Sequence, residues 1–178
     1  MNLIMIGMRG AGKSNVSRRL AVLCKRPVLS TDLLIQYDNG GRSVADIVDN
    51  EKRGWRAFRD MEYDVVKKVS ALDGAIVDCG GGVIVDIDDN GNEYFSKRKV
   101  DRLKQNGTVV WLRGDIKTLA QKVKKTEARP TLDQQRSAED VMRRRVPFYE
   151  KAADVILTID GRRRADIAEE IMARFPDL

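Results

Sequence analysis

The sequence contains no histidine, and this absence excludes a large part of enzyme chemistry. Without an imidazole there is no Ser-His-Asp triad, no histidine general base and no imidazole ligand for a metal. Cysteine is scarce as well. Cys24 and Cys79 alone build neither a four-ligand zinc site nor a disulfide framework, so we expect a protein of the reducing cytoplasm.

The chain also lacks long apolar runs and is poor in aromatic residues. No segment approaches the roughly 18 apolar residues of a membrane span, and the N-terminus lacks the basic segment of a signal peptide. Aromatic residues make up 6% of the chain and do not interleave with the basic clusters at 122–125, 143–145 and 162–164, so platforms for base stacking are missing. We therefore expect neither a membrane nor a nucleic acid as partner. A solvated face and phosphate-binding arginines account for the net charge of +6.

What is present is a regular alternation of short apolar runs and helical stretches. With 178 residues, 42% hydrophobic and 34% charged, the chain fits one globular domain, 1–178. Five β-rich runs hardly alternate polar with apolar residues, which is typical of parallel strands covered by helices on both faces. This order predicts a doubly wound, three-layer α/β/α fold with a five-stranded parallel sheet. The expected strands are 3–6, 27–29, 75–77, 108–112 and 155–159, and the expected helices are 14–24, 55–72, 97–105, 116–124, 138–152 and 164–175.

Two stretches interrupt this alternation. The first is acidic and rich in turn residues, with Asn90-Gly91 between apolar residues, and it predicts a hairpin at about 84–95. The second is polar and carries Arg129-Pro130, and it predicts a mobile loop at about 124–137.

A phosphate-binding motif follows the first expected strand and opens the first expected helix. Residues Gly7–Ser14 fit G-x-x-x-x-G-K-[ST] at every defined position. The glycines let backbone N–H groups turn toward the phosphates, and the helix N-terminus adds its positive end. Lys13 can reach the β- and γ-phosphates, and the Ser14 hydroxyl can coordinate Mg²⁺. The motif therefore predicts a nucleoside-triphosphate site rather than an ordinary glycine-rich turn. The expected ATP contacts are Gly10, Ala11, Gly12, Lys13, Ser14 and Asn15.

A second glycine-rich segment follows the third expected strand. It begins at Asp78, where P-loop proteins often place the carboxylate that holds the water shell of Mg²⁺. Three consecutive glycines, Gly80–Gly82, carry a large entropic cost and make sense where a ligand approaches the backbone closely. The alternative is a flexible turn into the hairpin.

Several charged residues are candidates for the rest of a site. Asp32 is expected at the end of the second strand, at the sheet edge where open α/β proteins bind ligands. Arg59, Arg129 and Arg145 are each, taken singly, better explained as solvated surface residues than as site residues. In the run 143–145, successive side chains point about 100° apart on a helix, so the pattern alone does not select Arg145.

Six motifs in a fixed order nevertheless give the chain a specific resemblance. From Met1 to about Phe175 it resembles the shikimate kinases, which belong to the nucleoside-monophosphate-kinase-like P-loop proteins. The matching motifs are Gly7–Ser14, Ser30–Gln36 (D-x-D-x-x-I-E in the family), Phe58–Glu62 (F-R-x-x-E), Gly80–Gly82, Arg129–Leu132 (R-P-x-L) and Arg145–Tyr149 (R-x-P-x-Y).

The resemblance implies a role for each residue that carries it. Asp32 would bind the shikimate hydroxyls and orient or deprotonate the attacking one, and Arg59 and Arg145 would grip the carboxylate. Gly80–Gly82 would present backbone N–H groups to the substrate. Arg129, on a lid that closes over ATP, would offset charge on the transferring phosphoryl group. Arg162, near the last strand, is our candidate for the adenine.

The sequence departs from the family in three places. Ser30 stands where the family usually has the first Asp of D-x-D, which helps to hold the Mg²⁺ water shell, and our hypothesis is that Asp78 supplies the missing carboxylate. The hairpin at about 84–95 is an insertion relative to typical members. The spacing between Arg129 and Arg145 is slightly short.

The P-loop predicts a nucleoside-triphosphate site, and the resemblance implies an ATP-dependent, Mg²⁺-requiring kinase that phosphorylates the 3-hydroxyl of shikimate in aromatic amino-acid biosynthesis. We expect a cytoplasmic monomer whose partners are ATP and shikimate. One alternative is a kinase for another polyol acid such as gluconate, against which Arg59, Arg145 and the glycine triplet argue. Another is a family member that has lost catalysis, which only Ser30 supports.

Overall fold

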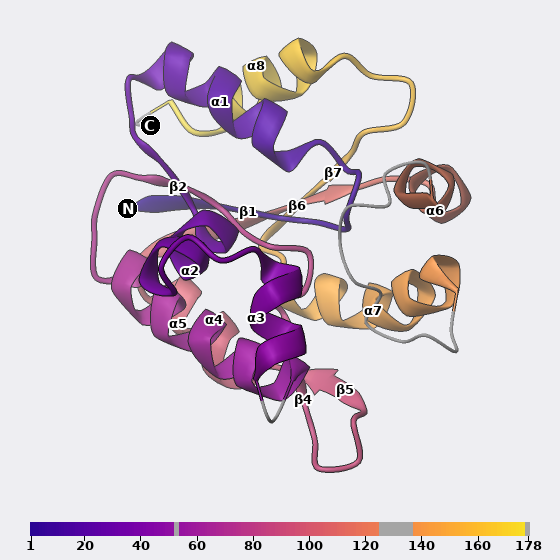
Figure 1. Ribbon diagram of the computed structural model, residues 1–178. Helices are drawn as coiled ribbons and strands as arrows, with labels where there is room; N and C mark the ends of the chain where they lie inside the picture. Colours follow the sequence, from indigo (N-terminus) through magenta and orange to yellow (C-terminus); the bar gives the residue numbers. More distant parts are fainter. Residues whose placement is uncertain (52–53, 125–136, 177–178) are drawn as a thin grey trace.

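The computed structural model describes residues 1–51, 54–124 and 137–176, and its centre is a five-stranded parallel sheet (Figure 1). The strands lie in the order β2-β3-β1-β6-β7, and every neighbouring pair is parallel. Their bounds are β1 Asn2–Ile6, β2 Val28–Ser30, β3 Ile76–Asp78, β6 Gly107–Arg113 and β7 Val155–Thr158.

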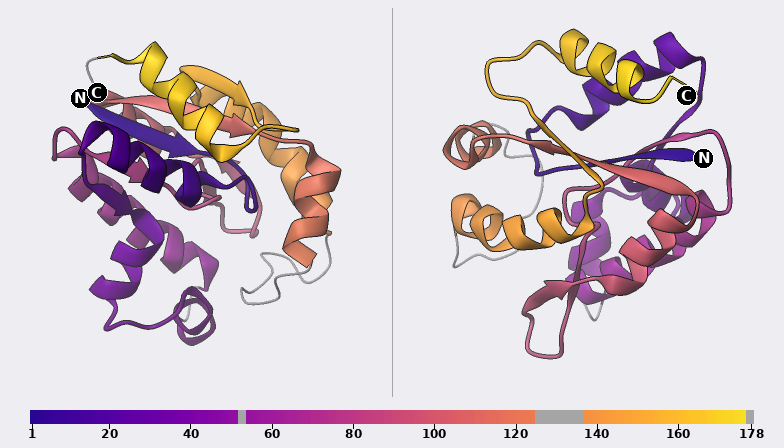
Figure 2. Two further views of the ribbon diagram at one scale, coloured as in Figure 1. Left: turned by 90° about the horizontal axis from the view of Figure 1, so that it is seen from above. Right: turned by 180° about the vertical axis from the view of Figure 1, so that it is seen from behind.

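Helices cover both faces of the sheet. Two of them, α1 and α8, pack together on one face, while α4, α5 and α7 lie against the other (Figures 1 and 2). This arrangement confirms the predicted three-layer α/β/α fold. The helices are α1 Lys13–Cys24, α2 Thr31–Asp38, α3 Val44–Asn50, α4 Trp55–Ser70, α5 Lys97–Gln105, α6 Ile116–Lys124, α7 Ala138–Ala152 and α8 Arg164–Arg174.

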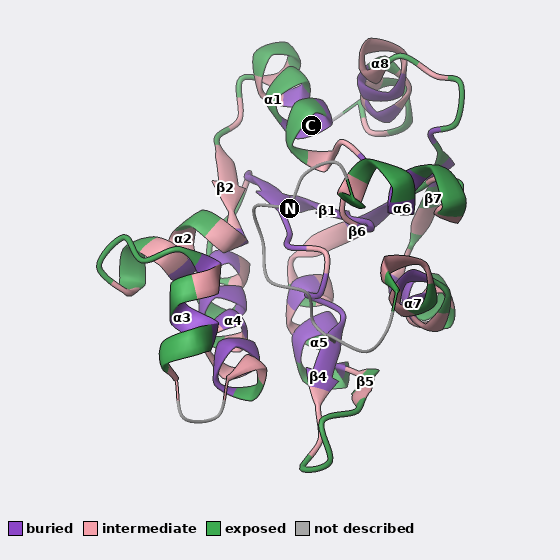
Figure 3. Cartoon of the chain, turned by 45° about the vertical axis from the view of Figure 1, so that its right-hand side comes forward, coloured by how far each residue is buried: buried purple, intermediate pink, exposed green. Residues whose placement is uncertain are grey.

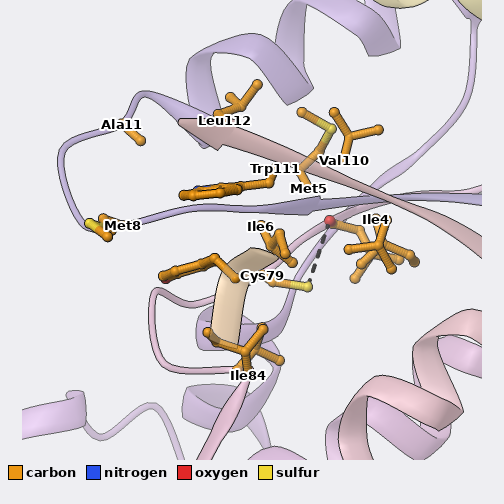
Figure 4. Packing of buried hydrophobic residues seen from close by; sticks show 14 of the residues in the cluster. Ile4, Met5, Ile6, Met8, Ala11, Cys79, Ile84, Val110, Trp111 and Leu112 are labelled. Carbon is orange, nitrogen blue, oxygen red and sulfur yellow. Dashed lines mark hydrogen bonds between the residues drawn. The ribbon is translucent and has the colours of Figure 1, made fainter. Parts of the chain in front are cut away.

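The core lies along the central strands, because these are covered on both sides. All five residues of β1 are buried (Figure 3). Trp111 of β6 stacks on Tyr149 of α7, with ring centroids 5.4 Å apart, and so ties α7 to the sheet. Cys79 packs among the core residues at the end of β3 (Figure 4), and burial raises the pKa of its thiol well above the ordinary value. Cys24 is only half-buried.

The structure contains two short helices that the sequence pattern did not predict. Helix α2 begins immediately after β2, so Asp32 is the second residue of a helix rather than the last of a strand. Helix α3 starts with a capping box, in which Ser43 Oγ accepts from the Asp46 backbone N–H at 3.1 Å and the Asp46 carboxylate accepts from the Ser43 N–H at 3.2 Å. Both helices lie against α4.

A small hairpin projects from the body beyond β3 (Figure 1). Strands β4 (Val85–Ile87) and β5 (Glu93–Phe95) pair antiparallel, as expected from Asn90-Gly91, and Gly91 takes a positive φ of 80° in the turn. The loop predicted at about 124–137 falls almost entirely outside the described residues. None of the described helices is long and apolar enough to cross a membrane.

Candidate active site

The P-loop connects β1 to α1 and wraps around the start of the helix. Gly10 and Gly12 adopt left-handed conformations, with φ of 83° and 82°, which only glycine takes without strain. Lys13 Nζ donates to the carbonyl oxygens of Gly7 at 2.9 Å and Met8 at 3.3 Å, so the amine lies across the mouth of the loop.

The P-loop opens onto a pocket of about 840 Å³ at the carboxyl ends of β1 and β3. These two strands are neighbours, while α1 covers one face of the sheet and α4 and α5 the other, so the chain leaves them in opposite directions. Such a switch point is where open α/β sheets bind ligands. The pocket brings together most of the residues that the sequence singled out. They are Gly10, Gly12, Lys13, Ser14, Asn15, Asp32, Arg59, Asp78, Gly80, Gly81, Gly82 and Arg145.

The glycine triplet forms one wall of the pocket, and side chains of the protein itself lie against it. A Cβ on Gly80 would overlap Asp32 Oδ1, and a Cβ on Gly82 would lie 2.6 Å from Cζ of Arg59. At these two positions glycine is therefore needed so that Asp32 and Arg59 can approach the backbone. The Gly81 carbonyl oxygen accepts hydrogen bonds from Arg145 Nη1 at 3.1 Å and from the Tyr149 hydroxyl at 2.6 Å.

Arg59, on α4, is buried against a carboxylate. Its Nη1 donates to Glu62 Oε2 at 3.0 Å, and the same oxygen accepts from Lys99 Nζ at 2.7 Å. Burial alone would raise the pKa of Glu62, but the charges of Lys99 and Arg59 outweigh it and hold that pKa below its ordinary value. Glu62 therefore stays charged and orients Arg59. The Arg59 Nε atom is buried and has no hydrogen-bond partner within the described part of the chain, which suits an anionic ligand.

Arg145, on α7, is also buried, and its carboxylate partner comes from the hairpin. Its Nε donates to Glu93 Oε2 at 2.9 Å and its Nη2 donates to Glu93 Oε1. Burial opposes the charge on Arg145, but the hydrogen bonds and the charge of Glu93 outweigh this and raise its pKa. Sequence reasoning did not find Glu93, and it named Tyr149 only as the last residue of the Arg145–Tyr149 motif, without a role. Glu93 lies 52 positions from Arg145, and no local pattern links the two.

Asp78 and Ser30 are direct neighbours across β3 and β2, where they form one register pair. Ser30 serves as the N-cap of α2, with its hydroxyl accepting from the Leu33 backbone N–H at 3.4 Å. Asp78 is buried, and its Oδ1 has no hydrogen-bond partner among the described residues. The Asp78 carboxylate thus lies on the strand next to Ser30, the position where the family usually has the first Asp of D-x-D.

Mg²⁺ in nucleotide sites is held by one or two protein groups together with phosphate oxygens and water. The described residues contain no group of three or more His, Cys, Asp or Glu side chains placed to hold a metal ion. Ser14 at the start of α1 and Asp78 with its orphaned oxygen are both in the pocket, and they fit a site of this sparse kind.

Three sequence candidates are not among the described residues that line this pocket. The side chain of Ala11 is fully buried in the hydrophobic core. Arg129 falls outside the described residues. Arg162 pairs with Glu170 at 2.6 Å and lines a separate hollow of about 180 Å³ rather than the main pocket. Its neighbour Arg164 lines the same hollow and also packs over the P-loop, since a Cβ on Gly12 would lie 3.1 Å from Arg164 Cζ. The sequence alone could not distinguish these two arginines.

Comparison with known proteins matches the shikimate kinase family model over residues 9–176. A shikimate kinase of Leptospira biflexa is 41% identical over 172 residues, covering 97% of this chain and 94% of the relative. A shikimate kinase of Leptospira borgpetersenii is 34% identical, with 96% of each chain covered. Among solved structures, shikimate kinase from Acinetobacter baumannii in complex with shikimate superposes with a TM-score of 0.82 at 27% identity, covering 99% of this chain and 93% of that one. The chain therefore belongs to the shikimate kinase family.

Proposed function

We propose that this protein transfers the γ-phosphate of ATP to the 3-hydroxyl of shikimate, a step of aromatic amino-acid biosynthesis. One observation carries the proposal: two buried arginines, Arg59 and Arg145, lie against the glycine triplet in the same pocket as the P-loop. Two guanidinium groups suit a carboxylate, and a P-loop suits a nucleotide. The pocket therefore offers one subsite for a carboxylic acid beside another for ATP.

Asp32 is the group that would act on the hydroxyl. It lies against Gly80, in the pocket between the P-loop and the arginines, so a substrate gripped by its carboxylate presents its hydroxyls to this side chain. Asp32 would orient the attacking hydroxyl and accept its proton. With no histidine in the chain, a carboxylate is the natural group for this role.

The remaining residues position the nucleotide and offset its charge. Backbone N–H groups of Gly10–Asn15 would cradle the phosphates, and Lys13 would move from the loop carbonyls to the transferring phosphoryl group. Arg129 stays our candidate for a lid contact and Arg162 for the adenine, with Arg164 closer to the P-loop. Phosphoryl transfer asks mainly for this kind of positioning and charge neutralisation.

Ser14 and Asp78 would hold the Mg²⁺ that accompanies ATP. Asp78 takes over from the serine at position 30, because the two side chains are register neighbours on adjacent strands. When bound, the ion supplies positive charge that balances the phosphate oxygens. We further propose a cytoplasmic monomer that binds neither nucleic acid nor membranes.

A coupled assay of ADP release, with shikimate, with gluconate and without acceptor, tests the proposal. Release that depends on shikimate is the expected result. Release that depends on gluconate would favour the polyol-acid alternative. ATP binding without release for either acceptor would favour a member that has lost catalysis, for which Ser30 is the only support.

A further inference from the structure

Glu93 is a buried carboxylate that the proposed mechanism has not used. It lies on β5 of the hairpin, and its side chain is only 4% exposed. Three arginine nitrogens converge on it: Nε and Nη2 of Arg145, and Nη2 of Arg144 at 3.3 Å. The hairpin thus places a negative charge directly behind an arginine that lines the pocket.

The contact with Glu93 leaves N–H groups of Arg145 available for a ligand. A guanidinium carries five N–H groups. Glu93 takes two of them along the Nε–Nη2 edge, and the Gly81 carbonyl takes one from Nη1. Among the described residues these contacts leave one N–H on Nη1 and one on Nη2, and each can donate a charge-assisted hydrogen bond to a substrate carboxylate.

Arg59 is also held by a buried carboxylate, and this parallel indicates a role for the contact between Glu93 and Arg145. Nη1 of Arg59 is bound by the buried carboxylate of Glu62, as the guanidinium of Arg145 is bound by Glu93. We infer that Glu93 is a positioning residue that acts through Arg145. It holds the guanidinium of Arg145 in the orientation that binds the substrate carboxylate, as Glu62 holds that of Arg59. This inference rests on the proposed function and adds to it a residue from outside the six family motifs.

The rival reading is that Glu93 occupies the place of the substrate carboxylate and must leave when shikimate binds. Displacement would break both hydrogen bonds from Arg145 to a carboxylate that is 4% exposed in its present place, and would leave Arg144 as its one arginine partner among the described residues. Breaking one side of a buried ion pair is strongly unfavourable. Retention of Glu93 beside the substrate avoids this cost, because the remaining N–H groups on Nη1 and Nη2 of Arg145 can bind the ligand while Glu93 stays in place.

The test compares steady-state kinetics of the whole protein with those of Glu93→Gln and Glu93→Asp. Removing the charge in Glu93→Gln should raise the KM for shikimate about tenfold, the effect of losing one charge-assisted hydrogen bond, while the KM for ATP changes less than about twofold. Glu93→Asp keeps the charge and should recover part of the loss. The matched control is Asp89→Asn at the hairpin tip, whose carboxylate is 84% exposed and pairs with Arg56; it should change neither KM.

Two further arms separate positioning from a general loss of structure. In the Arg145→Ala background, Glu93→Gln should have little additional effect, since the residue that it positions is gone. With shikimate methyl ester, whose carboxylate is blocked, wild type and Glu93→Gln should differ much less than with shikimate. Independent losses in the double variant, or equal losses with the ester, would show that Glu93 acts elsewhere.

The outcomes also distinguish a failure of the role of Glu93 from a failure of the proposed kinase function. A wild-type protein without shikimate-dependent ADP release would remove the proposed function itself. Normal wild-type turnover with an unchanged shikimate KM in Glu93→Gln would remove only the role of Glu93. A lowered KM would establish instead that Glu93 competes with the substrate.

Discussion

Gly82 lies so close to Arg59 that the methyl group of an alanine at this position would contact the proposed carboxylate-binding side chain. Its φ is not in the left-handed region, so alanine fits the backbone, but the new Cβ would lie 2.6 Å from Cζ of Arg59. Arg59 must move, and displacing a positioning group by about 1 Å can cost about a hundredfold in rate. We expect Gly82→Ala to lower kcat/KM for shikimate by about this factor while the fold is retained.

The comparison for Gly82→Ala is Gly81→Ala, measured in the same assay and by circular dichroism. At Gly81 the nearest atoms to a new Cβ belong to the P-loop backbone, with the Arg9 nitrogen at 3.3 Å, a tight contact that needs a shift of only a few tenths of an ångström and does not displace Arg59. The Gly81 variant should therefore lose less activity. Equal losses in both variants would mean that the triplet acts through its backbone alone, without regard to Arg59.

A second prediction for a single residue concerns Asp78. If it supplies the carboxylate for Mg²⁺, Asp78→Asn should raise the Mg²⁺ concentration for half-maximal activity at least about tenfold. Ser30→Asp in that background should restore much of the affinity, because the two positions are register neighbours. An unchanged Mg²⁺ dependence in Asp78→Asn would exclude this role for the residue.

The residues of the site differ in how far the sequence could reveal them. The P-loop is continuous in sequence, so its phosphate-binding role could be predicted without a structure. Arg145 was selected only by the resemblance, since any member of the run 143–145 could face the pocket. Glu93 and Arg164 reach their partners across long stretches of chain, so they emerge only after folding.

Among the elements, the hairpin is anchored by a buried carboxylate at its base. Asp86 on β4 accepts from Ser96 Oγ at 2.6 Å, Arg98 Nε at 2.8 Å and Arg98 Nη2 at 2.9 Å, and Lys99 Nζ lies 3.2 Å away. Burial would raise the pKa of Asp86, but the Arg98 hydrogen bonds and the Lys99 charge outweigh it and lower that pKa to about 2. The carboxylate therefore stabilises the protein mainly when ionised.

This lowered pKa gives a stability prediction with a definite sign. The contribution is complete above the ordinary value of 3.8 and is lost as the pH falls from there toward about 2. Asp86→Asn should lower the free energy of unfolding at pH 7 by about 2 kcal/mol, and the difference from wild type should shrink below about pH 4. Urea denaturation at a series of pH values measures both quantities.

The control for the Asp86 measurement is Asp101→Asn on α5. Asp101 pairs with Lys97, but both side chains are more than half exposed, and such surface pairs contribute little. This variant should match wild type within about 0.5 kcal/mol at every pH. A constant deficit of Asp86→Asn at all pH values would indicate a packing defect rather than lost charge.

The longer elements were predictable because each carries its own periodic pattern. The five strands of the main sheet and the helices from α4 onward lie within two residues of their expected bounds. The short helices α2 and α3, of eight and seven residues, give too few turns for an apolar stripe to stand out. Caps at Ser30 and Ser43 were their only local signals.

For the whole molecule, the absence of histidine leads to a prediction about activity. No imidazole titrates between about pH 6 and 8, and burial raises the pKa of the Cys79 thiol, which ordinarily lies above this range, still further from it. With saturating Mg²⁺ and ATP, we expect kcat/KM for shikimate to stay nearly constant from about pH 6.5 to 8. A unit slope within that interval would reveal an essential group whose pKa has been moved into it.

Lys99 has a consequence for how such a chain can change by mutation. It is completely buried and is held by Glu62, by the Val85 carbonyl and by Asp86, so its charge is balanced partly from α4 and partly from the hairpin. A deletion that removed the hairpin would take away Asp86 and the Val85 carbonyl, so that Lys99 and Arg59 would share the carboxylate of Glu62 as their one acidic partner among the contacts described above. Because a buried charge that loses a partner destabilises the fold, descendants that lose the hairpin should replace the lysine as well, and the two features should be inherited or discarded together.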